Sequence, residues 1–128
     1  MTMPDELQEV ADAMCQRHQV AAITVEIRVV RRGRARPGTH RVTVPAWALA
    51  LGREYAVYYV IHEVTHLISG QARHTPRFHE LEVEWLARYG MRPVYRRAYP
   101  RQMWSLDGEL LWEVPAHLRS KKAAGEGR

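Results

Sequence analysis

The sequence predicts an α+β fold in which helices and short strands occupy separate stretches of the chain. Apolar residues recur at helical spacing over residues 4–18, 55–69 and 75–89. Over residues 22–30, apolar and polar residues alternate, which is the pattern of a half-buried strand. Near the C-terminus, the tight-turn dipeptide Asp107-Gly108 is flanked by apolar residues, which predicts a β-hairpin.

The N-terminal part is predicted to be a helix followed by a β-hairpin. Pro4 and the acidic residues after it suit the first turn of a helix that runs to about residue 18. Strands over residues 22–30 and 39–44 then pair across a turn over residues 31–38. That turn carries a cluster of arginines, which forms either a solvated tip or a phosphate-binding site: Arg31, Arg32, Arg34 and Arg36.

The next helix, residues 55–69, is the most informative stretch of the chain. It contains no proline or glycine, is followed by Gly70, and is apolar nearly all round, which indicates a central helix. It also contains the motif His62-Glu63-Val64-Thr65-His66. Histidines four apart project from the same side of a helix, roughly 6 Å from each other, so they can hold one metal ion. The alternative is a pair of hydrogen-bonded core histidines.

Glu63 has a different geometry from the two histidines. It points about 100° away from His62 around the helix axis, so it is poorly placed as a ligand. It is better placed to take a proton from water at a metal site. A catalytic zinc usually has three protein ligands, so one further ligand is expected.

Several residues are candidates for the third ligand. His74 follows His66 by eight residues, and Gly70 permits the chain reversal that would bring His74 back over the helix end. His79 lies on the following helix. The acidic candidates there fit the solvated face of that helix more simply: Glu80, Glu82 and Glu84.

The rest of the chain carries weaker signals. Thr75 caps the helix over residues 75–89, and Gly90 follows its end. A strand over residues 94–99 and a hairpin formed by residues 101–106 and 109–114 are expected next. We expect one domain over residues 1–118 and a basic disordered tail over residues 119–128. His18, His40, His117 and Cys15 are expected to be structural or exposed side chains without a role in the site.

Composition sets further bounds on function. The chain has 128 residues and a formal net charge of +5, which suits an acidic partner such as nucleic acid. Cys15 is the single cysteine, so neither an internal disulfide nor a cysteine zinc ribbon is possible. The acidic N-terminus and the absence of a long apolar run predict no signal peptide and no membrane association. The expected compartment is the cytoplasm, and the oligomeric state is left open.

The histidine motif, followed by His74-Thr75-Pro76-Arg77-Phe78, resembles the SprT-like and Spartan-like minimal zinc metallopeptidases. In that family a histidine followed four residues later by an aromatic residue supplies the third zinc ligand. The resemblance covers about residues 5–90. It implies a minimal zincin-like domain with an N-terminal helix, a β-hairpin, a central HExxH helix, a ligand loop and a second helix. It also implies one Zn²⁺ per chain, held by His62, His66 and His74, with Glu63 as the general base.

The function expected from the residues and the resemblance is peptide-bond hydrolysis. The substrate is a protein or peptide, which could lie along the edge of the strand at residues 39–44. Candidate donors for the oxyanion are Arg77, His79, Tyr95 and Tyr99. One rival is a YbeY-like metal-dependent nuclease, whose three-histidine site lacks the glutamate beside the first histidine. Another rival is a non-catalytic zinc-containing module that binds DNA or protein.

Overall fold

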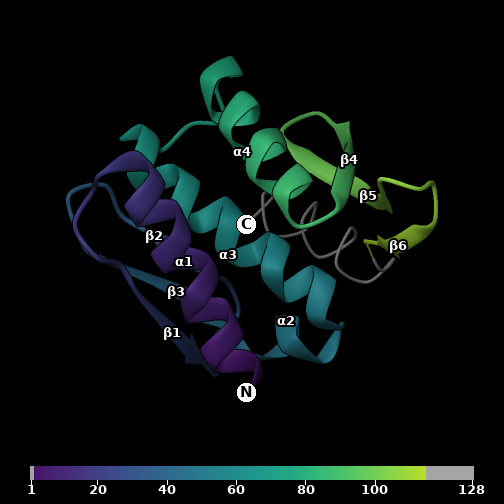
Figure 1. Cartoon of the computed structure of the whole chain (residues 1–128). Helices are drawn as coiled ribbons and strands as arrows, with labels where there is room; N and C mark the ends of the chain where they lie inside the picture. The colour runs from purple at the N-terminus through teal and green to yellow at the C-terminus, as the bar shows by residue number, and fades with distance from the viewer. Residues whose placement is uncertain (1, 115–128) are drawn as a thin grey trace, which may run out of the picture. The chain divides into compact units, whose positions relative to one another are not determined.

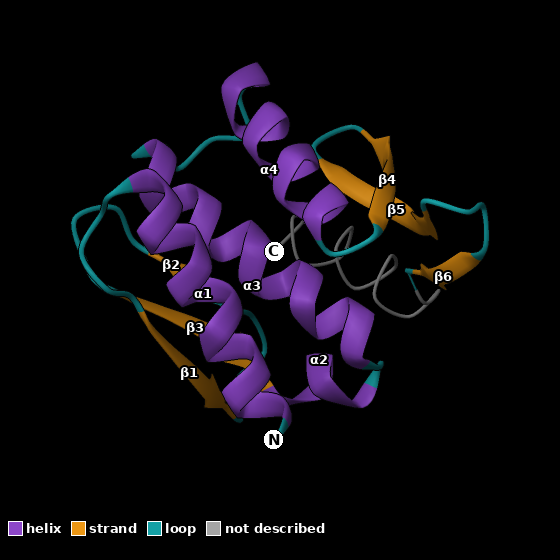
Figure 2. Cartoon of the chain, viewed as in Figure 1, coloured by secondary structure: helices purple, strands orange, loops and turns teal. Residues whose placement is uncertain are grey.

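The computed structural model describes residues 2–114, so His117 and the expected tail at 119–128 lie outside the described residues. The elements are α1 (Met3–His18), β1 (Thr24–Arg28), β2 (Arg34–Ala35), β3 (Arg41–Pro45), α2 (Ala46–Ala50), α3 (Arg53–Ser69), α4 (Pro76–Arg88), β4 (Met91–Arg96), β5 (Tyr99–Ser105) and β6 (Leu110–Glu113) (Figure 1). Helices and strands alternate only in part, so the α+β class is confirmed (Figure 2). The chain divides into two compact units, Met1–Tyr89 and Gly90–Arg128, and the single domain over residues 1–118 stays a prediction.

Helix α1 begins and ends where local chemistry satisfies its backbone. Thr2 and Asp5 form a capping box, in which the Thr2 hydroxyl accepts from the Asp5 amide and the Asp5 carboxylate accepts from the Thr2 amide. The helix is tied to the edge of β1 by Gln8. Its side-chain amide donates to the Ile23 carbonyl at 2.8 Å and accepts from the Val25 amide at 2.9 Å. Gln8 therefore occupies the Val25 amide on the outer edge of β1 and the Ile23 carbonyl just before the strand.

The first sheet has the order β1-β3-β2, which corrects the predicted hairpin. Strands β1 and β3 run parallel, and the antiparallel partner of β3 is the two-residue strand β2. Within the arginine-rich stretch that the sequence predicts as a turn, Arg34–Ala35 form strand β2, and the other residues are bends, turns or irregular. The charges on both sides of Ala35 obscure this short strand. Strand β3 is consequently central, so the prediction that residues 39–44 offer an edge to a peptide is wrong. The edge strands of this sheet are β1 and β2.

The connection into β2 depends on a glycine. A Cβ atom at Gly33 would lie 2.3 Å from Cε1 of Tyr59 and 2.6 Å from the Thr43 carbonyl oxygen, so no larger residue fits without movement. The Gly33 amide donates to the Tyr59 hydroxyl at 2.8 Å. The Trp47 indole donates to the Arg31 carbonyl at 3.0 Å. Two aromatic side chains, one from α2 and one from α3, thus hold the segment that leads into the edge strand.

Helix α3 is the centre of the first unit. It contacts α1, α4 and the sheet, and the inward-facing Val42 and Val44 of β3 are fully buried. Most of its length is enclosed, as expected for a helix with an almost continuous apolar surface. It ends at Gly70, which adopts the left-handed conformation with φ 68° and lets the chain turn back. The predicted bounds 55–69 agree with the observed helix apart from two extra residues at its start.

Helix α4 closes the first unit, and a small sheet makes up the second. The Thr75 hydroxyl accepts from the Phe78 amide and caps α4, as predicted. The second unit is an antiparallel sheet of order β4-β5-β6, and the expected hairpin around Asp107 and Gly108 joins β5 to β6. Its buried apolar side chains include Met91, Met103 and Trp112. Across the described residues, no helix combines the length and the apolar character needed to span a bilayer.

Candidate metal centre

Two histidines of α3 and one from the following loop converge at one point. His62 and His66 lie one helical turn apart, and both side chains are more than nine-tenths buried. Nε2 of His74 lies 3.1 Å from Nε2 of His62 and 3.2 Å from Nε2 of His66. These three residues form a group that could hold a metal ion. His74 therefore lies back over the end of the helix, as the sequence predicts.

The loop that presents His74 is built from a short series of hydrogen bonds. After the turn at Gly70, the Gln71 amide donates to the His66 carbonyl at 3.2 Å, so the loop folds onto the last turn of α3. The Gln71 side-chain oxygen accepts from the Thr75 hydroxyl, which in turn caps α4. Both ends of the loop are thus fixed to helices, and His74 between them has a defined position.

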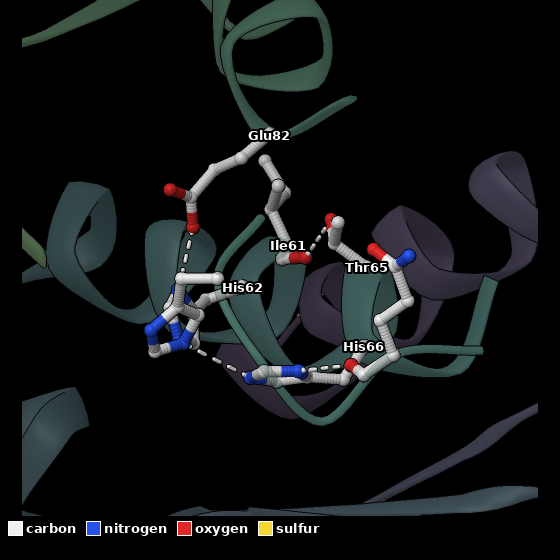
Figure 3. Close-up of polar contacts among 7 residues, drawn as sticks. Ile61, His62, Thr65, His66 and Glu82 are labelled. Atoms are coloured by element: carbon white, nitrogen blue, oxygen red, sulfur yellow. Dashed lines mark hydrogen bonds and ion pairs between the residues drawn. The ribbon is translucent and has the colours of Figure 1, made fainter. Parts of the chain in front are cut away.

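The outer nitrogens of the two helical histidines are fixed by acceptors. Nδ1 of His66 lies 2.8 Å from the Gln71 carbonyl oxygen, which can only accept, so Nδ1 carries the proton. Nδ1 of His62 lies 2.6 Å from the Glu82 carboxylate and donates in the same way (Figure 3). In the neutral rings, Nε2 of each histidine therefore carries a lone pair that points into the cluster.

This arrangement fits a cation. A single proton on Nε2 of His74 cannot serve two acceptor nitrogens equally well, whereas a metal ion accepts a lone pair from all three rings. In a tetrahedral zinc site with bonds of about 2.0–2.1 Å, ligand nitrogens lie roughly 3.3–3.4 Å apart. The separations of 3.1 and 3.2 Å are close to that spacing. Three neutral imidazoles are also a donor set that zinc prefers.

Burial keeps two of these rings neutral. Burial, followed by the positive charge that His62 and His66 can carry, lowers the pKa of His74 to about 4. Burial also lowers the pKa of His66, against the opposing effect of its hydrogen bond to Gln71. Protonation therefore competes weakly with metal binding at these two rings near neutral pH.

Glu82 is the site residue that sequence reasoning misplaced. It was expected on the solvated face of its helix, but its side chain is fully buried and reaches from α4 to His62 (Figure 3). Glu82 is buried because it lies four residues after Phe78 and four before Leu86, and both of these residues are buried on the same face of α4. That spacing was visible in the sequence. Glu80 and Glu84 are exposed, as predicted.

Glu63 lies beside the cluster but outside the group of converging nitrogens. Its side chain is 8 % exposed. Burial raises the pKa of Glu63 to about 7, with smaller effects from His62, which lowers it, and Glu82, which raises it. The group is therefore poised to take up and release a proton near neutral pH.

Phe78 forms an apolar wall behind the cluster. It is fully buried, and its ring centroid lies 5.0 Å from that of His62, 4.5 Å from that of His66 and 4.8 Å from that of His74. One aromatic side chain thus contacts all three imidazoles. His79 stacks on His74 with a centroid distance of 6.4 Å, so it lies next to the cluster without joining it.

The residues considered as oxyanion donors are divided between the two units. Arg77 is exposed on the first turn of α4, and His79 lies beside His74. Tyr95 and Tyr99 belong to the second unit, on β4 and β5. His40 is exposed, and Cys15 is buried, as expected of residues outside the site.

Comparisons of this chain with protein-family models, with curated proteins and with solved structures found no match.

Proposed function

We propose that the protein is a zinc-dependent metallopeptidase with a zincin-like arrangement, in which His62, His66 and His74 hold one zinc ion. The observation that carries the proposal is the convergence of three histidines, in which Nε2 of His74 lies 3.1 Å and 3.2 Å from Nε2 of His62 and of His66. Glu63 lies next to the first ligand on the same helix. A structural zinc site would be closed by a fourth protein ligand. Among the described residues, the group that could hold a metal contains three members only.

When bound, zinc would supply Lewis acidity towards the scissile carbonyl and towards water. Glu63 accepts a proton from the attacking water as the water oxygen bonds to the carbonyl carbon. The same carboxyl group then donates this proton to the nitrogen of the leaving amine as the C–N bond breaks. In the metal-free protein, burial raises the pKa of Glu63 to about 7, so this carboxyl group can both take up and release a proton near neutral pH.

Glu82 and Gln71 orient two of the ligands. By accepting from Nδ1, each of them directs the lone pair on Nε2 towards the shared centre. The negative charge of Glu82 also makes the His62 ring a stronger donor. Glu82 lies on α4, and Gln71 lies in the loop directly after α3.

An extended peptide substrate would find a free sheet edge at β2. Gln8 occupies part of the outer edge of β1, and β2 is the other edge strand of the sheet. Tyr59 contacts the segment that leads into β2 and lies one turn before His62 on α3. Addition of a peptide strand there would bring its backbone towards the face of α3 that carries the histidines.

The experiment combines metal analysis with a peptidase assay. Purified protein should contain about one zinc per chain and should digest an unfolded protein such as reduced casein. His66→Ala should lose both properties, and a chelator should abolish digestion until zinc is restored. The control is His40→Ala, which removes an exposed imidazole outside the cluster. Stoichiometric zinc without digestion would favour the non-catalytic module, and cleavage of RNA by the zinc-loaded protein would favour the nuclease.

A further inference from the structure

Strand β2 presents an open donor and an open acceptor at the edge of the first sheet. In the parallel pair, the Thr24 amide donates to the His40 carbonyl, so the even-numbered residues of β3 turn their backbone groups to β1. Thr43 therefore turns its amide and carbonyl to β2, where Arg34 lies opposite. Ala35, the next residue, directs its own amide and carbonyl away from β3, and no other described strand pairs with them.

Tyr59 limits how far a peptide can use this edge. Backbone groups alternate in direction along a strand, so the Gly33 amide also points away from β3, and there it donates to the Tyr59 hydroxyl at 2.8 Å. A peptide can therefore pair with Ala35 but not with the Gly33 amide. Gly33 lies two residues before Ala35, which is roughly 7 Å along an extended chain. Tyr59 lies four residues before Glu63 on α3, so a peptide anchored at Ala35 reaches the side of α3 that carries Glu63.

The side chains around Ala35 alternate between the two faces of the sheet. Ala35 lies beside Val42, which is fully buried, so its side chain belongs to the inner face, on which α3 packs. Arg34 lies beside Thr43 and belongs to the outer face, and Arg36 shares that face because the alternation has a period of two. Both arginines are exposed, and within residues 2–114 neither of them forms an ion pair. Two uncompensated positive charges thus flank the open backbone groups.

We propose that this edge selects extended peptide segments in which two acidic residues are separated by one other residue, and that such segments are preferred substrates of the histidine centre. As a statement about substrates, this inference rests on the proposed peptidase function. The peptide residue opposite Ala35 has its side chain on the inner face, so its two neighbours lie opposite Arg34 and Arg36 on the outer face. This holds for a peptide that runs in either direction. A carboxylate at each neighbour forms a cross-strand pair of opposite charge, whereas a lysine there is opposed by a like charge.

The open backbone groups identify the occupant as a polypeptide. Two arginines alone would attract any anion, but the amide and carbonyl of Ala35 match the backbone of an added strand. Arg34 and Arg36 also have the two-residue repeat of side chains on one face of a strand, roughly 7 Å. Two acidic residues that are adjacent in a peptide point to opposite faces, so only one of them can meet an arginine.

The test is fluorescence anisotropy with the full chain, freed of metal by a chelator so that no peptide is cleaved. Two labelled peptides of identical composition are compared, one with the core Thr-Glu-Thr-Glu-Thr and one with the core Thr-Thr-Glu-Glu-Thr. Because their charges are equal, general attraction to a basic protein cancels. The alternating peptide should bind at least about threefold more tightly. A smaller ratio, or no binding of either peptide up to about 1 mM, would overturn the proposal.

Charge reversal provides a second test. When Arg34→Glu and Arg36→Glu are combined, the preference should switch from the alternating glutamate peptide to its lysine counterpart, a gain that a folding defect cannot produce. The matched control combines Arg92→Glu and Arg96→Glu at exposed positions on β4. It changes the net charge equally and should keep the wild-type preference. An unswitched preference in the first variant, or the same switch in the control, would overturn the assignment to β2.

The binding measurements need no turnover, so the selectivity of the edge and the peptidase function can fail separately. Zinc-loaded wild type should cleave the alternating peptide with a kcat/KM at least about threefold higher than that of its isomer. Tighter binding of the alternating peptide without cleavage of any substrate would contradict the peptidase function and support the selectivity of the edge. Digestion of casein together with equal binding of the two isomers would support the peptidase function and overturn the selectivity.

Discussion

Replacement of Glu82 should weaken metal binding more than any other change outside the three histidines. Its carboxylate is fully buried and lies 2.6 Å from Nδ1 of His62. Glu82→Ala leaves that N–H without its acceptor in a buried place, which costs about 1–3 kcal/mol. Loss of a buried partner behind a metal ligand typically lowers metal affinity by about 10- to 100-fold. Glu82→Gln keeps an acceptor oxygen but loses the charge, so its effect should be at the lower end of that range.

The assay is a competition titration against a chromogenic zinc chelator at pH 7.5, together with urea unfolding of the metal-free protein. Glu84 provides the matched control, because it lies on the same helix, is exposed and pairs with Arg88 at 3.3 Å. Glu84→Ala should change stability by no more than about 0.5 kcal/mol and leave zinc affinity unchanged. Equal zinc affinities of Glu82→Ala and Glu84→Ala would refute the assigned role of the buried carboxylate.

Three further outcomes are expected. His74→Ala should lower zinc affinity far more than His79→Ala, and the reverse order would exclude the loop histidine as the third ligand. Gly33→Ala should destabilise the fold by about 1–3 kcal/mol in urea unfolding, because the new Cβ would overlap the Tyr59 ring; unchanged stability would mean that this segment moves freely. Between about pH 6.5 and 4, His74 takes up a proton in the unfolded chain but not in the folded one, so acidification through this window destabilises the metal-free protein. His74→Gln should lose less stability than wild type over that window, and parallel curves would contradict the lowered pKa.

The helices were the most predictable part of the fold. The predicted ends of α1, α3 and α4 lie within two residues of the observed ends. Capping residues and apolar spacing are local signals, so they can be recognised in the sequence. Thr75 and Gly70 are examples: one accepts from a helix amide, and the other adopts a left-handed conformation. The turn at Gly70 also allowed the position of His74 beside His62 and His66 to be predicted.

Strand pairing was less predictable, because it depends on contacts between distant residues. Strand β3 pairs with β1 in parallel on one side and with β2 in antiparallel on the other. The segment before β2 is held by the hydrogen bond between Gly33 and Tyr59, which are far apart in sequence. Helix α2 was also missed, since its five residues are too few for a periodic pattern. The burial of Glu82 follows from the packing of α4 on α3. Its spacing from Phe78 and Leu86 indicates a buried position, but the general preference of glutamate for exposed positions predicts the opposite.

The most direct test of the proposed chemistry is Glu63→Gln, measured at equal zinc content. Glutamine keeps the size of the side chain but cannot take up the proton, so the variant should hold one zinc and fold normally. Its initial rate of casein digestion should fall by roughly 10²- to 10⁴-fold relative to wild type. Glu54→Gln, on the first turn of the same helix, should digest casein at the wild-type rate. Near-normal digestion by zinc-loaded Glu63→Gln, or loss of its zinc, would contradict the account.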